Sequence, residues 1–171
     1  MRLVLLTLAL ATLLGCRSSP PPITDGMTMT WTYSVEGQGE GIMRVEFTKT
    51  SRGWLVRSQA GEAGELEPPT HRSLDERLRE DGEPFGIFFF PMWLPPSKRS
   101  ERSGYEEMSV REVVDWEAWS AWHATLGPAH GYYDVETGFL VGLSVPRLGD
   151  LKARLTETNV PGLAVGGAGR P

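Results

Sequence analysis

The sequence has little of the chemistry that several common classes of protein require. Its 171 residues include one cysteine and three histidines, and its formal net charge at pH 7 is -5. A single cysteine excludes an internal disulfide and any site held by several thiolates. The deficit of Lys and Arg argues against a nucleic-acid partner, because phosphate binding needs an excess of positive charge. We therefore expect no metal site, no cofactor and no nucleic acid.

The sequence also lacks the short motifs of common catalytic and nucleotide-binding sites. It contains no Gly-x-Ser-x-Gly, no Walker A loop and no Gly-x-Gly-x-x-Gly turn. Carboxylates are plentiful, but no spacing marks two of them as an acid–base pair. His130 and Asp134 are four residues apart, about 13 Å along a strand, and could approach one ion only if the chain bent at Gly131. We expect no catalytic residue, and a hydrolase with an unrecognised site is the third alternative.

The first sixteen residues are the most informative part of the chain. Arg2 supplies a positive start, and the uncharged apolar run from Leu3 to Leu14 follows it. That run has the length of a signal-peptide h-region and falls short of the roughly 20 residues that a permanent membrane helix needs. It ends in Leu13-Leu14-Gly15-Cys16, which resembles the lipobox of bacterial cell-envelope lipoproteins, although Leu14 is less usual there than Ala or Ser.

The lipoprotein resemblance implies that residues 1–15 are a signal peptide removed by cleavage between Gly15 and Cys16. It also implies acylation of the Cys16 sulfur, and two or three acyl chains give stable membrane anchoring. Arg17 stands where Asp signals inner-membrane retention in enterobacterial lipoproteins, which implies anchoring in the outer membrane. The domain would then face the periplasm, with exposure at the cell surface left open. The alternatives are an ordinary secreted protein and an uncleaved N-terminal anchor.

The remainder of the chain is expected to form one β-rich domain. Residues 16–25 contain three consecutive prolines and indicate an extended tether, residues 26–160 form the domain, and residues 161–171 form a flexible tail. From Met27 to Val35 apolar residues alternate with Thr and Ser, the pattern of a half-buried strand. Similar alternation around Val45 and Trp54, with short Gly-containing loops between, predicts an antiparallel meander.

Three segments are harder to assign from their pattern. Residues 71–82 are charged with Leu74 and Leu78 four apart, which favours a short surface helix. Residues 115–123 hold three Trp spaced by three, which fits a helix face, but the residues after them favour a strand, and we prefer the strand. Residues 85–94 are the most apolar stretch, yet Pro91 and the prolines after it exclude a regular central strand.

The chain from Tyr132-Tyr133-Asp134 to Leu155–Asn159 is similar to the closing hairpin of uncharacterised half-barrel lipoproteins of the lipoprotein-carrier type. The resemblance covers about the last thirty residues and consists mainly of turn chemistry. It implies a mainly β fold, with a curved, half-barrel-like antiparallel sheet and one or two short helices. In that fold the concave face holds acyl chains, but no binding residue matches one to one.

Aromatic residues are the remaining candidates for contact with a ligand or partner. A small β-domain needs large side chains to fill its core, so we favour a core role for most of them. An apolar cavity or a membrane-facing patch is the alternative. The segment from Phe88 to Pro96 is the exception most suited to an exposed interaction patch. The candidates are Phe88, Phe89, Phe90, Trp93, Trp116, Trp119 and Trp122.

Two functions remain open at this point. The first is a non-enzymatic, lipid-anchored binding module whose sheet encloses an apolar ligand or lipid. The second is a structural lipoprotein with a filled core that docks an envelope protein. Both attach to the membrane through the lipid on Cys16.

Overall fold

The computed structural model describes residues 20–62, 64–95, 100–103, 106–163 and 165. Eleven strands of this part form one antiparallel sheet, and two further pairs of short strands lie outside it. The strands of the large sheet are β1 (Met27–Val35), β2 (Gly39–Thr50), β3 (Gly53–Glu62), β4 (Glu65–Leu66), β5 (Thr70–Leu74), β10 (Ser100–Ser103), β11 (Glu106–Trp116), β12 (Trp119–Leu126), β13 (Ala129–Asp134), β14 (Leu140–Val145) and β15 (Leu151–Thr158).

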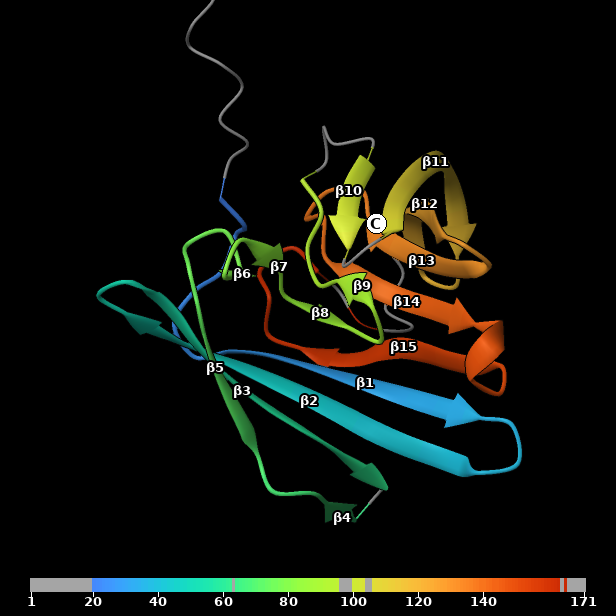
Figure 1. Cartoon of the computed structure of the whole chain (residues 1–171), viewed down its shortest axis with the longest axis horizontal. Helices are drawn as coiled ribbons and strands as arrows, with labels where there is room; N and C mark the ends of the chain where they lie inside the picture. The colour runs from blue at the N-terminus through green and yellow to red at the C-terminus, as the bar shows by residue number, and fades with distance from the viewer. Residues whose placement is uncertain (1–19, 63, 96–99, 104–105, 164, 166–171) are drawn as a thin grey trace, which may run out of the picture.

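The sheet is a continuous meander whose first and last strands along the chain meet in its middle. Its order is β10-β11-β12-β13-β14-β15-β1-β2-β3-β4, with β5 also paired to β3. The end strands β10 and β4 do not pair with each other, so the sheet is open, and Figure 1 shows it curving. The predicted mainly β fold with a curved antiparallel sheet is confirmed. The helical element of the described chain is a 3₁₀ turn, η1 (Pro146–Leu148).

Alternation along the strands separates the sheet into two faces. Met27, Met29 and Trp31 of β1 are at most 1% exposed and lie on the face that carries the core, here called the inner face. The threonines between them lie on the opposite, outer face, as the period of two requires. On β15, Leu151, Ala153 and Leu155 are inner, and Lys152 and Arg154 are outer and exposed.

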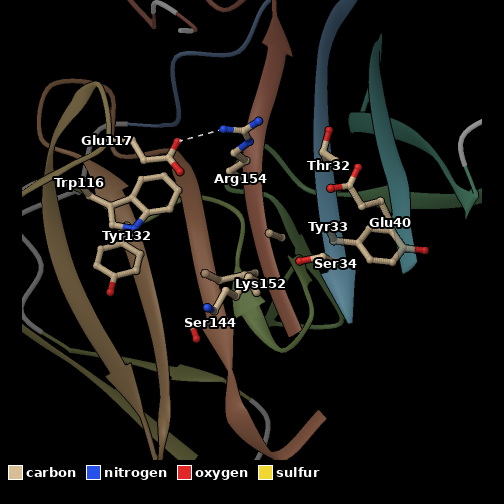
Figure 2. A pocket seen from close by; sticks show the side chains of 12 residues that line it. Thr32, Tyr33, Ser34, Glu40, Trp116, Glu117, Tyr132, Ser144, Lys152 and Arg154 are labelled. Carbon is tan, nitrogen blue, oxygen red and sulfur yellow. Dashed lines mark ion pairs between the residues drawn. The ribbon is translucent and has the colours of Figure 1, made fainter. Parts of the chain in front are cut away.

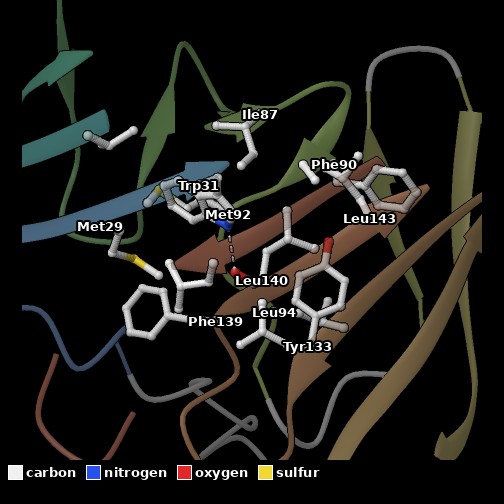
Figure 3. Close-up of a cluster of buried hydrophobic side chains, with 14 of the residues drawn as sticks. Met29, Trp31, Ile87, Phe90, Met92, Leu94, Tyr133, Phe139, Leu140 and Leu143 are labelled. Carbon is white, nitrogen blue, oxygen red and sulfur yellow. Dashed lines mark hydrogen bonds between the residues drawn. The ribbon is translucent and has the colours of Figure 1, made fainter. Parts of the chain in front are cut away.

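The inner face is covered by residues 75–95, here called the cover segment. It contains two short hairpins, β6 (Arg79–Glu80) with β7 (Glu83–Pro84) and β8 (Gly86–Ile87) with β9 (Phe90–Pro91). Figure 1 shows it lying across the sheet, and Figure 3 shows its apolar side chains among those of β1, β13 and β14. Six of these side chains are at most 7% exposed: Leu78, Phe85, Ile87, Phe90, Met92 and Leu94.

Hydrogen bonds fix the cover segment to the chain between β13 and β14. The Leu94 amide donates to the Gly138 carbonyl at 2.9 Å, and the Leu140 amide donates to the Met92 carbonyl at 3.0 Å. The buried Tyr133 hydroxyl donates to the Pro91 carbonyl at 2.9 Å. These bonds satisfy backbone groups of the proline-containing stretch from Pro91 to Leu94, and an unpaired buried group would be costly.

The helix expected over residues 71–82 is wrong. Residues 70–74 form β5 and pair with β3, and the chain then turns into β6. The Asp75 side chain accepts hydrogen bonds from the Arg77 and Arg79 amides at 2.7 and 2.9 Å, which builds a turn in place of a helix. Leu78 and Asp81 have positive φ, which interrupts any helix. The four-residue spacing of Leu74 and Leu78 instead places both in the core.

The preferred strand over residues 115–123 is confirmed. Trp116 ends β11 and Trp119 begins β12, and the two are partners across a two-residue turn. Glu117, the first turn residue, has a φ of 51°. The three-residue spacing of Trp116 and Trp119 therefore comes from a tight hairpin turn. Over so few residues it looks the same as the spacing along one face of a helix.

Packed chain extends beyond both ends of the sheet. Ile23, which precedes β1, packs against the core, and the Asp25 carboxylate accepts a hydrogen bond from the Lys49 amide at 2.7 Å. After β15, Val160 and Leu163 are each 4% exposed. The packed part of the chain therefore includes Ile23, which lies within the expected tether, and Leu163, which lies within the expected tail.

The contact between Gly131 and Phe90 gives a prediction about stability. A Cβ at Gly131 would lie 2.6 Å from the Phe90 ring, which is fully buried and has little room to move. We expect Gly131→Ala to lower the free energy of unfolding by about 1–3 kcal/mol, measured by urea unfolding. In the background of Phe90→Leu, which removes the ring, the same change should cost clearly less. Equal losses in both backgrounds would contradict this packing.

Candidate functional site

A groove of about 470 Å³ lies on the outer face of the sheet, over β1, β14 and β15. Figure 2 shows Trp116, Glu117 and Tyr132 on one side, Thr32, Ser34 and Glu40 on the other, and Ser144 and Lys152 between them. This volume lies in the range of small-molecule sites. We take this groove as the candidate functional site.

Strand register sets the floor of the groove as two parallel rows of outer-face residues. One row runs across five strands through His130, Ser144, Lys152, Ser34 and Glu40, each paired with the next. The second row runs through Tyr132, Gly142, Arg154 and Thr32. Positions two apart on a strand are separated by about 6.5–7 Å, so the rows lie side by side on one face.

Five rings on β11, β12 and β13, here called the ring ladder, stack in a row, and two of them, Trp116 and Tyr132, line the groove. In order of contact they are Trp119, Trp116, Tyr132, His123 and His130. Their planes are within 22° of parallel, and neighbouring centroids lie 4.9 to 5.7 Å apart. Such offset parallel contacts are favourable between aromatic rings. The ladder therefore holds Trp116 and Tyr132 in fixed positions beside the groove.

Glycine at position 142 lets the hairpin tip approach the sheet. The atoms that a Cβ at Gly142 would meet first are those of the Trp116 ring, so a side chain there would displace this ring. Beyond the ring, the Glu117 carboxylate lies 3.9 Å from the Arg154 guanidinium. Both side chains are largely exposed, so this ion pair contributes little stability and leaves the charges accessible to a ligand.

His123 and His130 are joined by a hydrogen bond at one end of the ladder. The His123 Nε2 and His130 Nδ1 atoms are 2.9 Å apart, and which of them donates depends on the tautomers. One ring must supply a lone pair, so the bond requires that at least one of the two is neutral. No group of three or more His, Cys, Asp or Glu suitable for a metal ion occurs in the described residues.

Burial lowers the pKa of His123 below its ordinary value of 6.5. The neighbouring His130 ring lowers it further, and Arg111 contributes in the same direction. Glu112, the cross-strand partner of His123 on β11, acts in the opposite direction. The folded protein therefore favours a neutral His123, which suits the hydrogen bond to His130.

The aromatic candidates from the sequence divide between this groove and the core. Trp116 lies beside the groove, and Trp119 is buried behind it at 4% exposed. Trp122 is half-buried and pairs with the inner-face Tyr133. The remaining candidates, Phe88, Phe89, Phe90 and Trp93, belong to the cover segment.

In the cover segment the four aromatic candidates have different surroundings. Phe90 is fully buried, and Phe88 makes an edge contact with the Tyr33 ring at 5.3 Å. Trp93 Nε1 donates to the Thr137 carbonyl at 3.0 Å. Phe89 is 67% exposed and borders a smaller groove of about 320 Å³. Gly15 and Cys16, the cleavage and lipidation residues, lie outside the described residues.

Sequence reasoning missed the rest of the groove, although one signal was available. The turn at Gly127 and Pro128 pairs Leu126 with Ala129, and counting outward from it pairs His123 with Tyr132. The same alternation that predicts β15 puts Lys152 and Arg154 on one face. What no local pattern reveals is the pairing of β15 with β1, which brings Thr32 and Ser34 beside them.

The lowered pKa of His123 gives a prediction about how stability depends on pH. Because its pKa is lower in the folded state than the unfolded value of 6.5, the unfolded chain takes up the proton first on acidification. The stability from neutral His123 is complete above pH 6.5 and is lost as pH falls through the folded pKa. We expect the urea concentration at the midpoint of unfolding to fall as the pH is lowered from 6.5 to the folded pKa of His123. In His123→Gln this decrease should be smaller. The exposed His71 on β5 is the control, and His71→Gln should keep the full decrease; an equal effect of both substitutions would contradict the assignment.

No helix in the described part of the chain is long and apolar enough to span a bilayer. Comparison with known proteins finds no matching family model, no matching curated protein and no matching solved structure. The residues of the groove and of the core are therefore the basis on which a function is assigned.

Proposed function

We propose that this chain is a lipid-anchored, non-enzymatic envelope protein that binds through the outer face of a sheet whose core is filled by its own residues. One observation carries the proposal. The inner face, which the resemblance to carrier lipoproteins would assign to acyl chains, is occupied by the cover segment. This arrangement favours the filled-core alternative over an enclosed lipid.

The cover segment packs its own apolar side chains against the described inner face. Phe90 and Met92 are fully buried, and Leu94 is 2% exposed. A groove on this side is lined by Arg72, Glu80 and Glu83 as well as by Met43, Phe85 and Phe89, and Arg72 and Glu80 are paired at 2.8 Å. Burying these charges under a hydrocarbon chain would be unfavourable, because the chain offers them no hydrogen bonds.

The outer groove has the features of a binding surface and not those of a hydrophobic core. It combines half-buried aromatic rings with exposed Lys152, Arg154 and Glu117. Rigid aromatic side chains give contact area at low entropic cost, and charged groups beside them give orientation. A sheet used only as a scaffold would not need Gly142 to admit a Trp ring beside such charges.

The anchoring part of the proposal rests on the lipobox resemblance at Cys16. The described chain begins at Pro20 and enters the sheet through Ile23 and Gly26. A lipid on Cys16 would therefore hold the domain close to the outer-membrane surface, on a tether of a few residues.

The filled core predicts that the protein carries no bound lipid besides its anchor. Native mass spectrometry of the full chain released from detergent should give the mass of the acylated polypeptide alone. A copurifying phospholipid or fatty acid that survives mild activation would contradict the filled core. A hydrolytic activity that purifies with the protein would contradict the non-enzymatic part of the proposal.

The anchor predicts that Cys16→Ser blocks acylation, because serine lacks the thiol that forms the thioether. The variant should remain as uncleaved precursor or leave the outer-membrane fraction, as followed by fractionation and by labelling with radioactive palmitate. Ser18→Ala, two residues away and outside the lipobox, is the matched control and should be processed normally. Normal labelling and cleavage of Cys16→Ser would contradict the lipoprotein assignment.

A further inference from the structure

The charges in the outer groove are balanced and closely spaced. Lys152 and Arg154 lie on neighbouring outer positions of β15, and Glu40 and Glu117 lie on the two sides of the groove. Arg154 is 3.9 Å from Glu117, and Lys152 forms no ion pair with any described acid. A strongly anionic ligand would meet two carboxylates here, and a strongly cationic one would meet Lys152 and Arg154.

Hydroxyl groups complete the floor. Ser34, Thr32 and Ser144 stand in the same two rows as Lys152 and Arg154. Lys and Arg only donate hydrogen bonds and carboxylates only accept them, whereas a hydroxyl does both. A ligand rich in hydroxyls can therefore accept from Lys152 and donate to Glu117 without bringing charge of its own. Hydrogen bonds to charged partners are the stronger kind.

The aromatic side of the groove adds apolar surface. Trp116 and Tyr132 are held 4.9 Å apart in the ring ladder and both border the groove. A ligand that suits this side has an apolar face as well as hydroxyls. Sugar rings combine the two, with axial C–H bonds on their faces and hydroxyls around their edges.

We infer that the outer groove binds the uncharged sugar rings of an oligosaccharide. Trp116 and Tyr132, whose faces pack on neighbouring rings of the ladder, contact the C–H groups of a sugar ring with their exposed edges. Lys152, Arg154, Glu117 and Glu40 hydrogen-bond its hydroxyls. The inference rests on the proposed function, since it names the ligand class of the same groove.

Binding is tested by calorimetry on the full detergent-solubilised chain with two uncharged probes, triacetylchitotriose and maltotriose. We expect at least one to bind saturably, and Arg154→Ala to weaken its binding by about tenfold or more. Arg57→Ala is the matched control: Arg57 is also an exposed arginine with a weak ion pair, to Glu46 at 3.4 Å, but lies outside the groove on β3. This control should leave the affinity unchanged.

A second variant keeps the test independent of any one charge. Trp116→Ala should also reduce the affinity by about tenfold, and circular dichroism will show whether its sheet is intact. If neither sugar binds, or if both arginine variants bind alike, the inference is overturned. Binding of a sulfated oligosaccharide alone, abolished by high salt, would show an anion site and overturn it too. The proposed function fails separately, on copurifying lipid or on normal processing of Cys16→Ser.

Discussion

The structure depends on the burial of the cover segment against the inner face of the sheet. An open sheet of eleven strands has one apolar face to hide, and no helix of the described chain covers it. Residues 75–95 do so with six large side chains and with backbone bonds to Gly138 and Leu140. The hydroxyl of Tyr133 and the absence of a side chain at Gly131 complete the fit around Pro91 and Phe90. Because this packing occupies the inner face, the proposed binding function is assigned to the outer one.

The strand pattern was accessible from the sequence because alternation is local. Met27 to Val35 and Leu151 to Thr156 show it plainly, and both became strands with the expected face buried. The error at residues 71–82 arose because a four-residue apolar spacing fits a helix, while the decisive contacts are the Asp75 turn and the pairing of β5 with β3. The hydrogen bonds of one turn-forming side chain and the pairing of distant strands both outweigh an apolar spacing that repeats only once.

The candidate site was predicted less well, for a related reason. Trp116 and Trp119 drew attention as aromatic residues, but their partners come from elsewhere in the chain. Tyr132 reaches Trp116 through the register of β12 with β13, and Thr32 reaches Arg154 through the pairing of the first and last strands. A groove on a sheet face is made of residues one per strand, so its composition appears in the sequence only as isolated residues far apart.

The place of β1 in the sheet has a mechanical consequence. This first strand of the described chain is a central one, bonded to β15 on one side and to β2 on the other. The groove residues Thr32 and Ser34 lie near its far end, about 20–26 Å along the strand from Gly26. A pull between the membrane and a ligand held in the groove would run along the axis of β1. It would load the hydrogen bonds of both neighbouring ladders in shear, together and not one after another, so the proposed tether would pull on a strand that two ladders hold.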